Sequence, residues 1–107
     1  MAALTTQNVP VTGLAPSYTA AGGSGDTIAP ADSTFLHVKN ASGGSVTVTV
    51  AVPGAEYGQN RPDVGVAVAA GAEGFIAIPR ELADPSDHRV HVTYSATTSV
   101  TVAALAV

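Results

Sequence analysis

The chain has 107 residues, of which 46% are apolar, and this size fits a single domain with a hydrophobic core. Only 11% of the residues are charged and the net charge is −4, so binding to nucleic acid or to an anionic membrane surface is not expected. The chain has no cysteine, which excludes disulfides and thiolate chemistry.

Residues 1–13 are predicted to form an extended N-terminal arm. Residues 1–8 are polar apart from Leu4, and Val9 and Val11 then flank Pro10, which lacks the N–H that a central strand needs. No basic stretch precedes a continuous apolar stretch, so no secretory signal is expected and the chain should fold in the cytoplasm where it is made. An arm of this kind could lie across a partner, and its candidate contact residues are Leu4, Thr6, Gln7 and Val9.

The clearest strand signal runs from Thr34 to Val52, after a short strand led by Tyr18 and a glycine-rich loop. Four valines alternate with Thr or Ala, which places Val46, Val48, Val50 and Val52 on one face of a strand. In the preceding run Leu36 and Val38 share a face, and Phe35, His37 and Lys39 share the other. Ser42-Gly43-Gly44 suits a tight turn, so the two runs are predicted to pair as a β-hairpin.

A loop of about ten residues follows Val52, and loops of that length are often functional. Within it Tyr57 and Arg61 are the best candidates for contacts with a partner, because Tyr and Arg are enriched at the centres of interfaces. Residues 64–69 and 75–78 are predicted to form a second hairpin, and residues 90–95 and 99–107 the last two strands. The intervening stretch, 79–89, is the most charged part of the chain and offers Arg80 and Arg89 as further contact candidates.

These segments amount to about seven or eight short strands at intervals of roughly 8 to 12 residues, with no amphipathic helix. The sequence therefore predicts one all-β domain over residues 1–107. Its expected architecture is an antiparallel β-sandwich or a small β-barrel, with the extended arm at its N-terminus.

The residues that could carry chemistry do not form a recognisable site. His88 and His91 are three positions apart, which places them on opposite faces of a strand, and His37 is expected at the surface or in an interface beside Lys39. Asp84, Ser86 and Asp87 fit turn capping better than a calcium loop, because the glycine and the final glutamate of an EF-hand are missing. Since no nucleophile elbow, catalytic triad or phosphate-binding loop is present either, we expect no catalytic, metal or cofactor site and no enzyme.

Several phrases of the sequence resemble small head proteins of tailed bacteriophages, particularly phages of actinobacteria. They are the arm from Thr6 to Gly13, the segment from Thr12 to Ala21, the phrase FLHVKN at 35–40 and the ending that contains SVTVAAL at 99–105. The resemblance spans nearly the whole chain, and its phrases are structural rather than catalytic.

The resemblance implies a capsid decoration protein, made in the cytoplasm of a bacterial host, that binds the outer surface of the mature head and stabilises it. Its partners would then be the major capsid protein and further copies of itself, with a homotrimer as the preferred assembly. A tail-associated or head-to-tail connector protein is the main alternative. A carbohydrate-binding or adhesion module is weaker, because Phe35, Phe75 and Tyr94 are expected in the core and few aromatic side chains would be left to bind a sugar.

Overall fold

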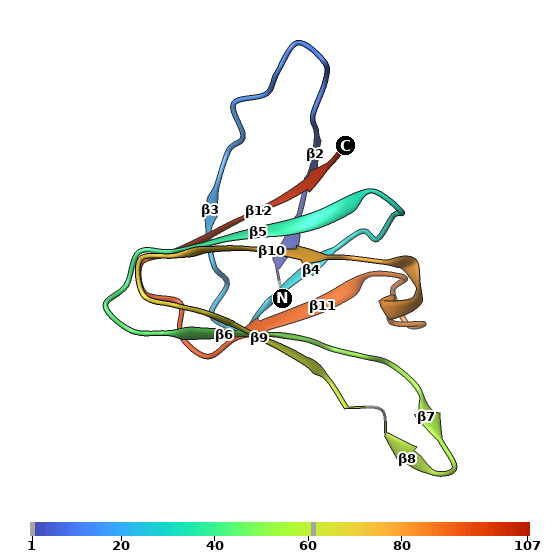
Figure 1. Cartoon of the computed structure of the whole chain (residues 1–107). Helices are drawn as coiled ribbons and strands as arrows, with labels where there is room; N and C mark the ends of the chain where they lie inside the picture. Colours follow the sequence, from blue (N-terminus) through green and yellow to red (C-terminus); the bar gives the residue numbers. More distant parts are fainter. Residues whose placement is uncertain (1, 61) are drawn as a thin grey trace.

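The computed structural model describes residues 2–60 and 62–107, which form a β-sandwich of two five-stranded sheets (Figure 1). Sheet A has the strand order β1-β4-β11-β6-β9; sheet B has the order β10-β5-β12-β2, and β3 also pairs with β12. A small hairpin of β7 and β8 lies outside both sheets. The strands are β1 (Ala2–Leu4), β2 (Thr6–Asn8), β3 (Thr19–Ala20), β4 (Asp26–Ile28), β5 (Thr34–Asn40), β6 (Val46–Val50), β7 (Ala55–Glu56), β8 (Gln59–Asn60), β9 (Val64–Val68), β10 (Glu73–Ala77), β11 (Val90–Tyr94) and β12 (Val100–Ala106).

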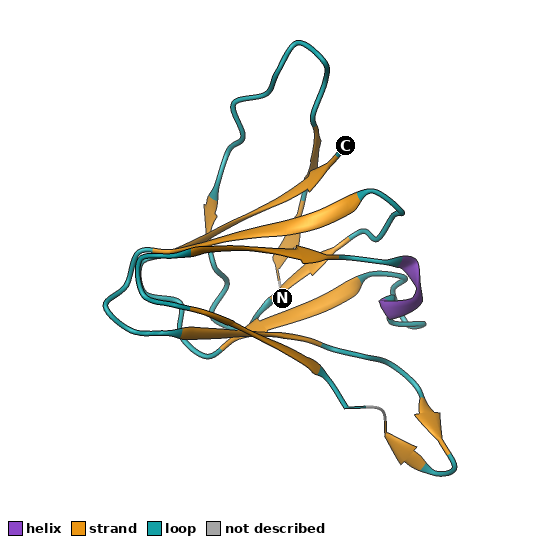
Figure 2. Ribbon diagram, viewed as in Figure 1, coloured by secondary structure: helices purple, strands orange, loops and turns teal. Residues whose placement is uncertain are grey.

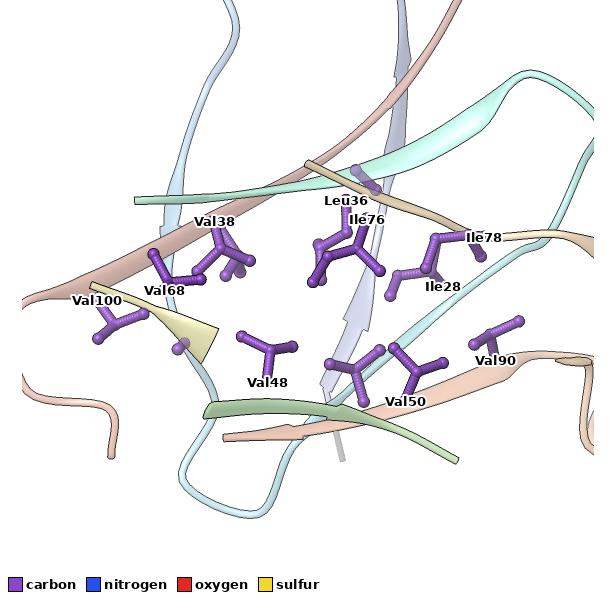
Figure 3. Packing of buried hydrophobic residues seen from close by; sticks show 14 of the residues in the cluster. Ile28, Leu36, Val38, Val48, Val50, Val68, Ile76, Ile78, Val90 and Val100 are labelled. Carbon is purple, nitrogen blue, oxygen red and sulfur yellow. The ribbon is translucent and has the colours of Figure 1, made fainter. Parts of the chain in front are cut away.

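The predicted all-β fold is confirmed, and so are most of the predicted buried faces. Val46, Val48 and Val50 point from β6 into the space between the sheets, where Leu36 and Val38 meet them from β5; all five side chains are buried. Figure 3 shows the two layers of aliphatic side chains facing each other. The core contains small β-branched side chains, which pack well on pleated surfaces.

The predicted hairpins are wrong, because the strands on either side of each turn lie in different sheets. β5 is in sheet B and β6 in sheet A, and the same separation holds for β9 and β10 and for β11 and β12. Each turn therefore crosses between the sheets as an arch. The three arches lie together at one end of the sandwich (left in Figure 1), where Asn40 N donates to Ala72 O and Ala41 N donates to Ser99 O.

The predicted extended arm is not confirmed, because residues 2–8 belong to the sandwich. β1 pairs in parallel with β4 in sheet A, and after Thr5 the chain crosses to sheet B, where β2 pairs in parallel with β12. The sheets are therefore mixed rather than purely antiparallel. Both parallel pairs are made by this N-terminal segment, which closes one side of the sandwich.

Two segments project from this body. One is the loop between β2 and β3, at the top of Figure 1, and the other is the β7–β8 hairpin, at the lower right of Figures 1 and 2. In the part of the chain that the structure describes, the one helix is a single 3₁₀ turn, Arg80–Leu82, and no helix there is long and apolar enough to cross a membrane.

Candidate functional site

The tip of the β7–β8 hairpin presents the most exposed aromatic side chain among the described residues. Tyr57 is fully exposed, with a relative accessibility of 103%. Its φ is +52° and that of Gly58 is +77°, the signs that a type I′ turn requires at its two central positions. Glycine and asparagine adopt this conformation readily, whereas a tyrosine is held there at a cost of about 1 kcal/mol. The sequence predicted Tyr57 as a contact residue, and the structure places it where a partner can reach it.

The loop between β2 and β3 presents apolar side chains at the other projection. Val11 is fully exposed, and Val9 and Leu14 are exposed by 40% and 38%. The base of this loop is fastened by Gln7, whose Nε2 donates to Ser17 O at 2.8 Å and whose Oε1 accepts from Ser17 N at 2.9 Å. Gln7 therefore positions the loop, while the apolar side chains beyond it are free to meet another molecule.

A cluster of aromatic and charged side chains covers the outer face of sheet B. The imidazole of His37 stacks on the ring of Phe75, with centroids 4.3 Å apart and planes 13° from parallel. Its Nδ1 lies 2.6 Å from the hydroxyl of Tyr18, and Lys39 Nζ lies 4.0 Å from the centre of the Tyr18 ring. Its Nε2 lies 2.7 Å from Glu73 Oε1, close enough for an ion pair but without the angular geometry of a hydrogen bond.

This cluster corrects three expectations from the sequence, for His37, Phe75 and Phe35. His37 was expected at the surface or in an interface with a partner, but within this chain it is only 6% exposed because Tyr18 and Phe75 cover it. Phe75 was expected in the core, but its side chain lies on the outer face and is 67% exposed. Phe35 was also expected in the core, but it meets Phe75 on the outer face in an edge-to-face contact, with ring centroids 5.7 Å apart. Tyr94 does pack against the core as predicted. Neighbouring strands thus gather side chains that lie far apart in the sequence.

A buried carboxylate links β4 to β11 and to the glycine-rich loop. Asp26 is 1% exposed; its Oδ2 accepts from the hydroxyl of Tyr94 at 2.7 Å and from Gly22 N at 3.1 Å. Burial, and secondly the bond to Asp26, raises the pKa of Tyr94 well above its usual value. Tyr94 therefore stays a neutral donor, and the network holds the fold together rather than offering a reactive group.

The loop before β11 is organised by side-chain caps, as predicted. Asp84 Oδ1 accepts from Ser86 Oγ and Ser86 N at 2.7 and 2.8 Å, and these bonds lower the pKa of Asp84. Asp87 Oδ1 accepts from Arg89 N at 3.0 Å, and this bond, followed by the contact of Asp87 with His91 at 2.8 Å, lowers the pKa of Asp87. The carboxylates are thus used within the turn itself.

The other predicted contact residues are spread over the molecule. Arg89 lies within the fold, where its guanidinium donates to Thr27 Oγ1, Thr27 O and Leu4 O at 2.9 to 3.2 Å. Leu4 packs against the core, and Thr6 is half-buried in β2. Arg80 is exposed and lies 3.3 Å from Asp32, and Arg61 lies outside the described residues. Of all these candidates, Tyr57 and Val9 are the two that lie on the projecting segments.

Comparison with protein-family models, with curated proteins and with solved structures finds no match for this chain. Within residues 2–60 and 62–107, no group of three or more His, Asp or Glu side chains could hold a metal ion. A shallow groove beside Gln7 and Ser17 is lined by residues without ionisable side chains. The surface therefore offers contact area: an exposed tyrosine on one projection, apolar side chains on the other, and one aromatic face on sheet B.

Proposed function

We propose that this chain is a bacteriophage capsid decoration protein, which binds the outer surface of the mature head and stabilises it against disruption. The proposal rests on the resemblance of the sequence to small phage head proteins and on a surface with few charges. Binding to the assembled lattice but not to its precursor stabilises the shell by mass action.

The observation that carries the proposal furthest is the placement of Tyr57. Its side chain contributes nothing to the core, and its backbone is held in a conformation that tyrosine adopts at a cost. A rigid aromatic side chain on a projecting hairpin is well suited to insert into a pocket of a partner, because tyrosine buries much area and loses little conformational entropy. We assign this hairpin to the contact with the major capsid protein.

The experiment uses phage heads assembled without this gene product, to which purified protein is added before sedimentation. Wild-type protein should bind to saturation in a simple ratio to the major capsid subunit. Tyr57→Asn should bind at least tenfold more weakly, since loss of a central tyrosine typically costs over 1.4 kcal/mol. Its fold should be intact, because Asn-Gly is the pair that a type I′ turn favours. Val107→Ser is the control, because it removes another exposed apolar side chain that lies outside the hairpin.

Failure of the wild-type protein to bind such heads would overturn the proposal. If the purified chain then formed closed rings, commonly of six, the alternative of a tail-associated or connector protein would take its place. Wild-type binding with an unchanged affinity for Tyr57→Asn would keep the decoration function and remove the hairpin from the contact. Copies bound per capsid subunit also test the expected homotrimer, which remains a prediction.

A second candidate function, binding of carbohydrate, is favoured by the aromatic cluster on sheet B. The objection that the aromatic side chains are used in the core does not apply to Phe75, whose exposed ring lies beside Glu73 and His37. A sugar ring can stack on an exposed aromatic face while its hydroxyl groups donate hydrogen bonds to a neighbouring carboxylate. Binding to a glycan array that Phe75→Ala abolishes would support this function, and Tyr57→Asn would leave it unchanged.

A further inference from the structure

Strand β9 forms an open edge of sheet A. Among the described residues it pairs on one side with β6, and its other side has no strand beside it. Its sequence from Val64 to Val68, VGVAV, contains no charged residue and no proline. An exposed, uncharged edge strand of five residues is a template for pairing with another strand, and natural proteins usually protect such edges.

The hydrogen bonds of β6 show which backbone groups of β9 face outward. Thr47 uses its N–H and C=O toward Ser95, and Ala51 N donates to His91 O, so the odd-numbered residues here face β11. The even-numbered residues of β6 therefore face β9, where Val48 is opposite Val66. It follows that Gly65 and Ala67 direct their N–H and C=O groups toward the free edge.

The other sheet edges are better protected. β1 is three residues long, and Leu4 O is already bonded to Arg89. β2 is also short, and Gln7 fastens it to the neighbouring loop. β10 is as long as β9 but carries the charged side chain of Glu73, and a charge on an edge strand discourages pairing with another strand.

We propose that β9 pairs with β9 of a second copy of this chain, in antiparallel orientation around a two-fold axis at Val66. In this register Gly65 and Ala67 of one copy exchange backbone hydrogen bonds with Ala67 and Gly65 of the other. Val66 lies opposite itself, on the inner face, where it already packs against the core. Val64, which is 46% exposed, gains apolar contact with Val68 of the second copy. The two sheets A join into one continuous sheet.

The partner strand is taken from a second copy of this chain because β9 is complementary to itself in this register. Small residues meet small residues, valines meet valines, and no charge is placed opposite another. The pairing differs from the three-fold association expected from the sequence, and molecular mass separates the two. The pairing through β9 does not depend on the proposed capsid function, since it concerns the purified chain alone.

Single cysteines test the register, because the chain has no cysteine of its own. Across the axis the Cβ atoms of two Val66 residues lie about 4.5–5.5 Å apart, close to disulfide distance, so mildly oxidised Val66→Cys should become a covalent dimer. Val64→Cys is the matched control, because its two copies lie four positions out of register, about 13 Å apart. Val64 is the more exposed of the two, so random collision would cross-link it at least as fast. Equal cross-linking of both variants would overturn the proposal.

Sedimentation of the protein without cysteines provides the second measurement. Wild-type protein should reach twice the 10.5 kDa mass of one chain as its concentration rises. Ala67→Pro removes an outward N–H and leaves the bonds to β6 in place, so it should stay a monomer with an unchanged circular dichroism spectrum. A wild-type monomer at every concentration, a trimer, or a folded Ala67→Pro dimer would each contradict pairing through β9.

Discussion

Asn40 is the polar side chain on which the arches at one end of the sandwich depend, and its removal should be among the most damaging polar changes. It is 2% exposed, and its Nδ2 donates to Gly44 O, Val68 O and Ala69 O at 2.8, 3.0 and 3.2 Å. Its Oδ1 accepts from the backbone N–H and the hydroxyl of Ser42 at 3.0 and 2.5 Å. One amide thus links the end of β5, the turn into β6 and the turn between β9 and β10.

Replacing Asn40 by alanine should lower the free energy of unfolding by about 3 kcal/mol. The two N–H groups of the amide are shared among the carbonyl oxygens of Gly44, Val68 and Ala69 and contribute about 1 kcal/mol each, and carbonyl oxygens left buried without a donor add about 1 kcal/mol or more to the loss. For a domain of this size the melting temperature should fall by roughly 12–20 °C. Thermal unfolding followed by circular dichroism, with urea titration at 25 °C, measures both quantities.

Two variants separate this explanation from a general effect of the turn. Ser42→Ala removes only the hydroxyl bonds and should cost about 0.5–1 kcal/mol. Asn40→Asp keeps an acceptor for Ser42 but places a second oxygen against the three carbonyls, so it should be at least as unstable as Asn40→Ala. A loss below 1 kcal/mol for Asn40→Ala, or equal losses for Asn40→Ala and Ser42→Ala, would refute the assignment of the arches to this amide.

Three further changes test other parts of the fold. A Cβ on Gly22 would lie 2.6 Å from Gly25 O, so Gly22→Ala should lower the free energy of unfolding by over 1 kcal/mol, as measured by urea titration. Gly23→Ala is the control: its Cβ would meet open space, so its free energy of unfolding should stay within about 0.5 kcal/mol of wild type. Tyr94→Phe leaves the buried carboxylate of Asp26 without its hydroxyl donor and should cost about 1–3 kcal/mol by the same assay; a neutral effect would exclude this role. The pKa of Asp87 in the folded protein lies below its ordinary value of 3.8. The ionised carboxylate therefore stabilises the fold fully above about pH 4, and this stabilisation is lost as the pH falls through the folded pKa. Asp87→Asn should consequently lose less stability on acidification than wild type.

The sequence by itself determined the longer strands and most of their buried faces, but not the short strands β1, β2, β7 and β8, which lie in segments predicted as an arm and a loop. The alternation at Val46, Val48 and Val50 places three valines on one side of an extended chain whatever that chain pairs with, because the side-chain period of a strand is two. The same local reasoning identified the turn caps at Asp84 and the exposure of Tyr57, since both depend on residues close by in the chain.

Only the tertiary structure decided how the strands pair. A short glycine-rich turn can fold back as a hairpin or cross between sheets, and in both cases the valines of β6 and the apolar residues of β5 end in the same core. Alternation therefore cannot tell one from the other; contacts such as those of Asn40 with Val68 and Ala69 do.

The positions of His37 and Phe75 were also decided by the tertiary structure. Both lie on the face of sheet B away from the core, and their burial depends on which strand lies beside β5 and on where the chain brings Tyr18. The parallel pairing of residues 2–8 has the same origin, because a short polar segment carries no pattern that specifies its neighbour. Strand formation is a local property of the chain, whereas pairing is set by contacts between residues far apart in the sequence.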